Sequence, residues 1–517
     1  MGLRVRRLGL LAGLLGGLLA PRAARAQLAP VGVPAGVVRI ELDGAMDIWD
    51  SRYRDGTREP LGTDLSSSAL GSDLLPSLAD ADARIGRITG VTGYALNLGK
   101  LTTDAQADVS TGFAGLALGL TRNITIFGRL PLVRSRVQAS YQLDPATADA
   151  GLNPGATAEA TFFSQFDASL TALGDRIAAG DFDGNPALKA QAQAALADGT
   201  ALRGDLFGLL ADPSTASPFV PTTGSTAGTA VAARVTALQT ALASDFGVAG
   251  FTEPVALPAD PATAADFVGF LADPAGPIAT RPGESKVTFR GDAEAGVALT
   301  LVDHWDRGSH RGGFRTAVEG LVRFPTGTVA RSDRVLALGT GEGQTDLELR
   351  LTADLGAGNW GFRAEGDYNR QLAADYLLRV AAPTQPLAGS DRLPTVRRDP
   401  GDVLSLTVRP FYRLAPTLAI QGLASVWSRK ADVVSYLTDA DSIPGVDAAV
   451  VAEGTKAKAT TLGIGITYSN LGRLREGGKS MPVDASWSYE RVVKSSEGIV
   501  PNKHTFRARF RVYFGLW

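Results

Sequence analysis

Acidic and basic side chains recur at every second position along much of this sequence, with apolar residues between them. Rows of this kind could line a polar path for a solute, or they could pair with one another and fill a protein interior as a ladder of ion pairs. The residues themselves leave both interpretations open. The candidate lining residues are Glu41, Asp43, Asp47, Arg290, Asp292, Glu294, Arg315, Glu319, Arg323, Asp346, Glu348, Arg350, Arg363, Glu365, Asp367, Arg409, Arg413, Arg507, Arg509 and Arg511.

Residues for enzyme, metal or phosphate chemistry are scarce. The three histidines are His304 and His310, in an expected turn, and His504, at the start of the last expected strand. A hydrolase would need a Ser or Asp partner beside one of them, and no local motif supplies it. We therefore expect no catalytic residues and a protein that is not an enzyme.

Two acidic segments are candidate cation sites. Asp181–Asn185 resembles a calcium loop, but its glycine falls two places early and no Glu closes it. The acidic residues Asp439, Asp441 and Asp447 are more typical of a solvated loop. We expect no metal site and no cofactor.

The elements that carry these charges are expected to be strands. From Asp346 to Leu355, charged and apolar residues alternate strictly, and the segment from Trp360 to Tyr368 repeats the pattern. Because successive side chains of a strand point to opposite sides, each segment has one apolar and one charged face. The Gly- and Asn-containing stretch 356–359 between them predicts a tight turn, and hence a hairpin.

About twelve segments alternate in this way, and most reach the roughly 9–11 residues that a tilted strand needs to cross a bilayer. They lie near 38–49, 110–120, 124–143, 286–302, 313–325, 344–355, 359–369, 402–413, 417–429, 456–469, 482–493 and 503–516. Short connections alternate with long ones, which is typical of outer-membrane barrels with short periplasmic turns and long external loops. The prediction is a transmembrane antiparallel up-and-down β-barrel of about twelve strands.

The first residues predict export. Arg4, Arg6 and Arg7 precede the short apolar run 8–20, and Ala24-Arg25-Ala26 supplies a small-x-small cleavage pattern. These features indicate a signal peptide, residues 1–26, cut after about Ala26. The alternative, a membrane anchor, would need an apolar run of roughly 20 residues. Nucleic acid is not an expected partner, because 51 Lys and Arg are balanced by 53 Asp and Glu.

A soluble β-sandwich also alternates, but its apolar face would point into a core. A barrel in lipid reverses this, since charge facing lipid costs about 2–4 kcal/mol at the midplane. The export signal and an aromatic C-terminal strand favour the membrane. So does an expected interfacial girdle formed by Trp49, Trp360, Tyr368, Tyr412, Tyr468, Trp487 and Tyr489. The predicted location is the outer membrane, with its lipid and the barrel-assembly machinery as partners.

Residues 144–285 break the pattern. They are rich in alanine, with helical stretches near 156–178, 186–211 and 227–245 punctuated by Pro and Gly. We expect a helical extracellular insert, either a solvated decoration or a lid or plug over the pore. The expected organisation is therefore a signal peptide (1–26), N-terminal barrel strands with the first long loop (27–143), the insert (144–285) and C-terminal barrel strands (286–517).

Closure of the barrel predicts a charged seam. The first strand would point Glu41, Asp43 and Asp47 inward, and the last would point Arg507, Arg509 and Arg511 inward. Because neighbouring strands bring same-face residues within about 4.5–5.5 Å, we expect these three acids to face these three arginines.

Two stretches resemble a known family. In residues 116–133 a Gly-Leu-Thr turn is followed by a strand ending in Leu130-Pro131-Leu132, and residues 323–327 read Arg-Phe-Pro-Thr-Gly. Both are similar to the outer-membrane transporter-like barrels associated with aromatic-compound (phenol) degradation, distant relatives of fatty-acid and hydrocarbon channels. The 144–285 insert and the position of Trp517 depart from that pattern.

The resemblance implies passive uptake of small, hydrophobic or aromatic molecules, and a passive channel is our leading hypothesis. The alternative is a structural or surface-binding barrel whose external loops carry the interaction. A third, weaker class is an outer-membrane hydrolase.

Overall fold

The computed structural model describes residues 30–305, 312–332, 334–471 and 481–516. The predicted signal peptide, His310 and Trp517 lie outside these residues. In the described part of the chain, no helix is both long and apolar enough to cross a membrane.

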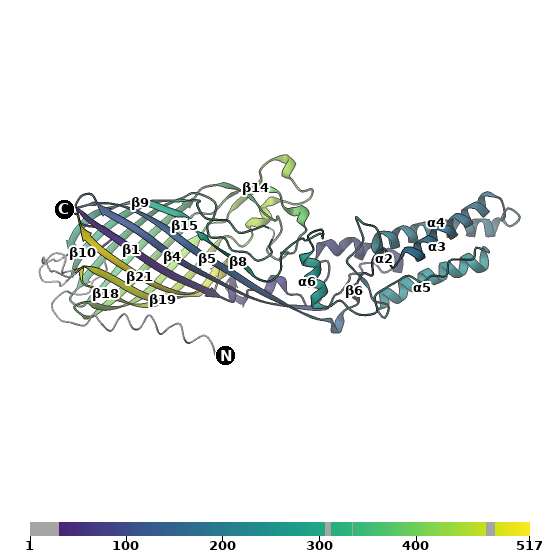
Figure 1. The fold of residues 1–517 in the computed structure, drawn as a ribbon, viewed down its shortest axis with the longest axis horizontal. Helices are drawn as coiled ribbons and strands as arrows, with labels where there is room; N and C mark the ends of the chain where they lie inside the picture. Colours follow the sequence, from purple (N-terminus) through teal and green to yellow (C-terminus); the bar gives the residue numbers. More distant parts are fainter. Residues whose placement is uncertain (1–29, 306–311, 333, 472–480, 517) are drawn as a thin grey trace.

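A closed antiparallel barrel forms the larger part of the molecule (Figure 1). β8 and β9 follow one another along β5 and are separated by Gly291 and Asp292, so together they fill one position in the wall. The barrel therefore has twelve strand positions, which confirms the predicted fold. Its strands are β1 (Val37–Trp49), β4 (Lys100–Gly119), β5 (Ile124–Asp144), β8 (Ser285–Arg290), β9 (Ala293–Trp305), β10 (Gly312–Phe324), β11 (Asp346–Ala357), β12 (Trp360–Gln371), β15 (Val403–Ala415), β16 (Leu418–Arg429), β18 (Ala457–Ser469), β19 (Val483–Glu497) and β21 (His504–Gly515).

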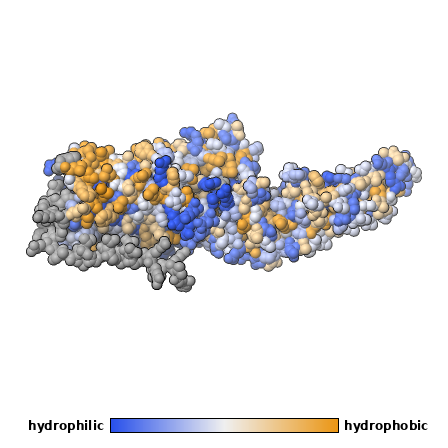
Figure 2. Space-filling view, in the orientation of Figure 1, coloured by the Kyte–Doolittle hydropathy of each residue, from blue (hydrophilic) through white to orange (hydrophobic). Residues whose placement is uncertain are grey.

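The apolar face of each strand points outward, as a lipid environment requires. In β11, Leu349 and Leu351 are 55% and 51% exposed, whereas Asp346 and Asp354 are 1% and 2% exposed. A soluble sandwich would show the opposite arrangement. Figure 2 shows hydrophobic residues gathered over the barrel, toward the end that carries the short turns.

The predicted aromatic girdle is confirmed in part. Trp360, Tyr368 and Trp487 are exposed on the outer face. Trp49 is buried, against Ala107 and Val137, and the Lys503 ammonium lies 5.5 Å from its ring centroid. Trp49 has the parity of Asp47 in β1, so it belongs to the inner face, and its assignment to the girdle is wrong.

A helical arm projects from the end of the barrel opposite the short turns (Figure 1). Its helices are α2 (Ala79–Thr89), α3 (Ala160–Ala178), α4 (Pro186–Leu210), α5 (Thr226–Thr240) and α6 (Ala264–Ala272). β4 and β5 run on toward it as a two-stranded ribbon, since their pairing continues to Lys100 and Asp144. α3, α4 and α5 match the helical stretches expected from sequence and point away from the barrel, so the plug interpretation of the insert is wrong.

The arm is built from two loops, not one. α2 comes from the first long loop, 50–99, and packs against α4 and α5. Its Ile85 and Ile88 share one apolar core with Phe162, Leu206 and Val231. The sequence pattern predicted helices only within 144–285.

Short strands decorate the same end of the barrel. They form three small sheets: β2 (Ser51–Arg54), β3 (Thr57–Pro60) and β20 (Ile499–Pro501); β13 (Ala374–Leu377), β14 (Thr395–Asp399) and β17 (Val433–Tyr436); and β6 (Ala150–Leu152) with β7 (Phe219–Pro221). The connections β4–β5, β11–β12 and β15–β16 at the other end span only a few residues.

Candidate functional site

The barrel interior holds a polar cavity of about 400 Å³. Its wall is formed by inward-pointing residues of most barrel strands, because alternation places every second side chain inside. Fourteen of the twenty candidate residues line it: Glu41, Asp43, Glu294, Glu319, Arg323, Glu348, Arg350, Arg363, Glu365, Asp367, Arg409, Arg507, Arg509 and Arg511.

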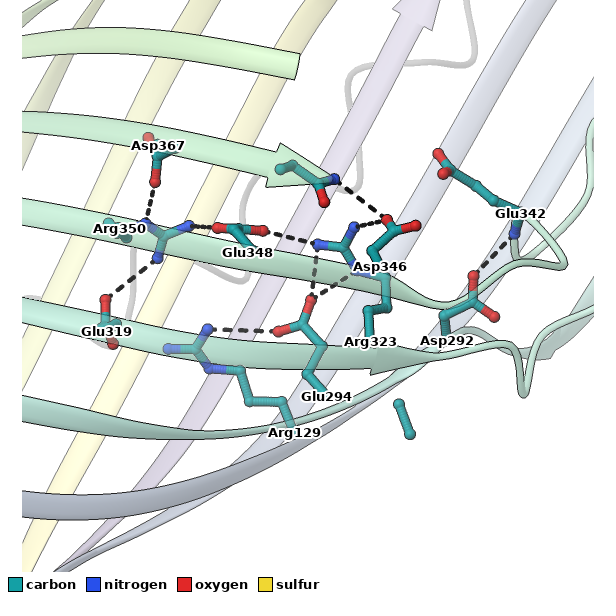
Figure 3. Close-up of polar contacts among 12 residues, drawn as sticks. Arg129, Asp292, Glu294, Glu319, Arg323, Glu342, Asp346, Glu348, Arg350 and Asp367 are labelled. Carbon is teal, nitrogen blue, oxygen red and sulfur yellow. Dashed lines mark hydrogen bonds and ion pairs between the residues drawn. The ribbon is translucent and has the colours of Figure 1, made fainter. Parts of the chain in front are cut away.

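One wall of the cavity, from β9 to β12, carries a chain of ion pairs (Figure 3). Arg323 contacts Glu294 at 3.2 Å, Asp346 at 2.9 Å and Glu348 at 3.4 Å. Arg350 contacts Glu348 at 2.6 Å and Glu319 at 3.5 Å, and it also pairs with Asp367. Each guanidinium thus bridges three carboxylates, at least one of them on a neighbouring strand, which offsets the cost of removing these charges from bulk water.

The seam between β1 and β21 carries a second set of pairs. Glu41 lies opposite Arg511 and Asp43 opposite Arg509. The corresponding nitrogen–oxygen distances are 3.2 Å and 2.8 Å. These two pairs are as sequence analysis expected.

The third seam pair is different. Asp47 lies opposite Thr505, whose hydroxyl donates to it at 2.6 Å, and Arg507 lies opposite Ala45. The expectation of three matched pairs is wrong at this position, because the third inward residue of β1 is Ala45, so that Asp47 lies one pair beyond Arg507.

A smaller cavity of about 220 Å³ lies toward the short turns. Arg315 and Asp354 line it, with their Nε and Oδ2 atoms 2.5 Å apart. Arg363 pairs with the other oxygen of Asp354 at 2.6 Å. The Arg315 guanidinium also lies 4.8 Å from the ring centroid of Trp305, a buried aromatic that sequence analysis did not select.

The remaining candidates lie at the ends of the strands. Asp47 and Asp346 do not line the larger cavity. Asp47 accepts a hydrogen bond from the Thr505 hydroxyl, and Asp346 accepts one from the Asn369 amide. Asp292 accepts the backbone N–H groups of Gly327 and Glu342, each at 2.8 Å, and so anchors the loop after β10. Arg413 donates to the carbonyl of Gly358 in a short turn.

Arg290 does not face the interior. It is exposed and pairs in register with Leu132, which is 65% exposed on the outer face. Gly291 and Asp292 interrupt the strand after Arg290, so the alternation does not continue in phase from β8 into β9. The sequence pattern assumed an unbroken strand, and its assignment of Arg290 to the lining is therefore wrong.

Several lining residues escaped sequence analysis. Arg39, Arg129, Asp484 and Glu490 face the larger cavity. The signal for Arg39, Asp484 and Glu490 was present, because each shares the inward parity of its strand. Pro30 and Val31 also line the cavity although they belong to no strand, and no periodicity could have indicated them.

The histidines and acidic clusters form no recognisable centre in the part of the chain that the structure describes. His504 hydrogen-bonds through Nδ1 to the Tyr489 hydroxyl at 2.8 Å. No group of three or more His, Cys, Asp or Glu side chains among the described residues could hold a metal ion.

Comparison with known proteins finds structural likeness alone. No family model matches this sequence, and no curated protein matches it. Among solved structures, an outer membrane channel from Pseudomonas putida F1 aligns over 94% of this chain and 100% of its own, with a TM-score of 0.42 and 10% identity.

Two other solved barrels align less well. The translocator domain of the autotransporter NalP from Neisseria meningitidis covers 93% of this chain and 89% of its own, with a TM-score of 0.30 and 10% identity. The toluene transporter TodX of P. putida covers 93% and 91%, with a TM-score of 0.24 and 10% identity.

Proposed function

We propose that this chain is an outer-membrane barrel that works as a narrow passive channel for small molecules. The observation that carries the proposal is the charged cavity of about 400 Å³ inside a closed barrel whose outer face is apolar. A barrel that served only as an anchor could fill its interior with apolar side chains, whereas this one keeps ionised groups around a space large enough for water.

The lining narrows the class of solute. Nine arginines and nine carboxylates face the cavity. A wall of this kind favours solutes that carry polar groups of their own over purely apolar ones. The sequence resemblance and the name of the toluene transporter point to aromatic molecules. Both considerations are met by small aromatic solutes that carry hydroxyl, carboxyl or amino groups.

Conductance in planar bilayers tests the channel. Purified protein should show discrete current steps, smaller than those of wide porins, because ion pairs occupy much of the lumen. The control is heat-modifiable migration of the same sample, which reports an intact barrel. An intact barrel that passes no current, in the full-length chain and in the variants described below, would refute the channel.

We also propose that the short turns face the periplasm and the arm lies outside the cell, since long loops of such barrels are external. Protease added to intact cells should then cut within 144–285 and 370–401 while the barrel strands survive. Cutting only after the outer membrane has been opened would reverse the orientation.

A surface-binding barrel is the second candidate, and the arm is the observation that favours it. The arm has its own apolar core and projects beyond the barrel, as a binding module would (Figure 1). If a barrel without the arm conducts like the full-length protein, transport is a property of the barrel alone. An intact full-length barrel without conductance, whose arm is needed for attachment of the cell to a surface, favours the binding function.

A further inference from the structure

The segment preceding the first strand, Pro30–Ala35, lies inside the barrel. Val33 is 2% exposed and belongs to an apolar cluster with Ala117, Phe127, Ala298 and Leu321. Those four residues come from β4, β5, β9 and β10, which are neighbours in the wall. The segment therefore lies inside the lumen, packed against this part of the wall, and it belongs to no strand.

Polar contacts seat the segment in a defined position. The Val33 N–H donates to the Thr125 hydroxyl at 2.8 Å, and that hydroxyl lies 3.3 Å from the Val33 carbonyl oxygen. Arg39 donates to the Val31 carbonyl at 3.1 Å. The seat is close, because a Cβ added to Gly32 would come within 2.6 Å of the Thr300 hydroxyl.

The same segment separates the two cavities of the lumen. Pro30 and Val31 line both the 400 Å³ cavity and the 220 Å³ cavity. The smaller cavity also contacts Gly32–Ala35 and Arg122, which lies in the short turn after β4. A solute that moved along the axis between the two cavities would have to pass this segment.

The segment is held far less firmly than the wall. A barrel strand is hydrogen-bonded on both sides along its length, whereas Pro30–Ala35 has the few contacts given above and one turn bond from the Val37 N–H to the Pro34 carbonyl. Pro30 and Pro34 have no N–H to donate. At its base Gly36 has a φ of +68°, a left-handed conformation that glycine adopts without strain. The Gly36 N–H donates to Gly119 and its carbonyl accepts from Leu516, which fixes this end to the rim.

We propose that Pro30–Ala35 is a movable strap, the barrier that sets permeability of this channel, and that its release about Gly36 joins the two cavities into one path. The proposal rests on the channel function proposed above. Release exposes one buried valine and breaks a few hydrogen bonds, without opening any strand pairing. This cost is small compared with any rearrangement of the wall.

Deletion of residues 30–35 from the full-length chain is the first test. The deletion should raise single-channel conductance severalfold. Val33→Asp should act in the same direction by placing a carboxylate in the apolar seat, and Val91→Asp, at an exposed position of the arm, is the matched control. Full-length protein and deletion variant with equal conductance would overturn the strap while leaving the channel in place.

Chemical modification of engineered cysteines tests the barrier independently of conductance measurements. The chain has no cysteine, so single cysteines are clean probes. Ser488→Cys lines the larger cavity, and Arg122→Cys lines the smaller one at an exposed position of the short turn. A charged methanethiosulfonate reagent supplied from the short-turn side should modify Arg122→Cys readily and Ser488→Cys slowly, and deletion of the strap should raise the rate at Ser488→Cys. Equal rates in the full-length protein would contradict the proposal.

A disulfide keeps the proposal testable should the deletion prevent folding. Val33 and Ala298 belong to the same apolar cluster. A disulfide between Val33→Cys and Ala298→Cys would therefore tether the strap to β9. The oxidised protein should show lower conductance than the reduced protein. Identical conductance in both states would show that the strap does not move during permeation, whereas silence of every intact variant would refute the channel itself.

Discussion

Single arginines organise the barrel interior. The guanidinium is planar and carries five N–H donors, so one side chain can satisfy carboxylates on two or three strands. Arg323 and Arg350 both do this, and Glu348 is shared between them. A lysine at either position would offer a point charge on a flexible stem and could not span the same carboxylates.

Removal of Arg350 tests this role. Arg350→Met would leave Glu319, Glu348 and Asp367 close together without their shared cation, and we expect a loss of about 3 kcal/mol, since breaking a buried pair typically costs about 3–5 kcal/mol and this lumen admits water. Arg350→Lys should lose less. The measurement is the temperature at which the barrel loses its compact form on a gel. A methionine variant as stable as the parent would show that these contacts contribute nothing net.

Glu159, in the arm, is the residue with the clearest pH response. Its side chain is buried, Oε1 accepts from the Ala256 N–H at 3.0 Å, and Oε2 is buried without a hydrogen bond. Burial, with Glu253 nearby, raises the pKa of Glu159 to about 7. Because the folded arm holds this proton more tightly than the unfolded chain, the free energy of unfolding falls as pH rises from about 4.5 to 7 and is flat above that range.

Glu159→Gln should remove that dependence. Above about pH 7 the variant should be more stable than the parent by up to about 3 kcal/mol, and near pH 4 the two should agree. Thermal unfolding of the arm followed by circular dichroism across this pH range is the measurement. Asp260→Asn, at an exposed position of the arm that does not contribute to the raised pKa of Glu159, is the control. A parent arm whose stability rises with pH would show that Glu159 is ionised and paired.

At the scale of the elements, the seam between β1 and β21 is specified by charge as well as by backbone hydrogen bonds. Reversal of Arg509 and Arg511 to Glu would place them against Asp43 and Glu41 and should impair assembly or lower thermal stability. Adding Glu41→Lys and Asp43→Lys should restore part of the loss, because the register pairs these residues directly. The measurement is the folded fraction in membranes.

The matched control for the seam is Arg507→Glu, which removes no seam pair because Arg507 lies opposite Ala45. The variant with all four substitutions is compared with the one in which only Arg509 and Arg511 are reversed. If it assembles no better, the attraction across the seam contributes little to assembly compared with the backbone hydrogen bonds.

The strands were predictable from sequence, and the reason is physical. Lipid outside and water inside impose a period of two on every strand, so the twelve segments and their inward rows followed from alternation. Arg290 was placed wrongly because the register against β5 shifts by one residue between β8 and β9, which reverses the alternation. The strap and α2 were missed for another reason: Pro30–Ala35 has no period, and the apolar face of α2 is covered by helices that follow more than a hundred residues later.

At the scale of the whole molecule, barrel and arm have separate cores. The arm cluster contains Leu101 at the base of the ribbon, but its other buried members lie in the loops. The barrel, in contrast, is held by its ladder and its lumenal ion pairs. We therefore expect that the arm can be removed without unfolding the barrel, provided that both loops that build it are shortened together.

The last prediction compares two deletions. Removal of 150–260 alone takes away α3, α4 and α5 and leaves the buried residues of α2, Ala81, Ile85 and Ile88, facing water. That variant should aggregate or be cut rapidly within 71–95. Removal of 71–95 as well takes away the uncovered helix, and the shorter loops close at modest entropic cost, since this cost changes only slowly with loop length. The double deletion should therefore give a heat-modifiable barrel in higher yield than the single deletion. Equal recovery of both would show that α2 is stable without its partners, and failure of the double deletion alone would show that the arm takes part in barrel assembly.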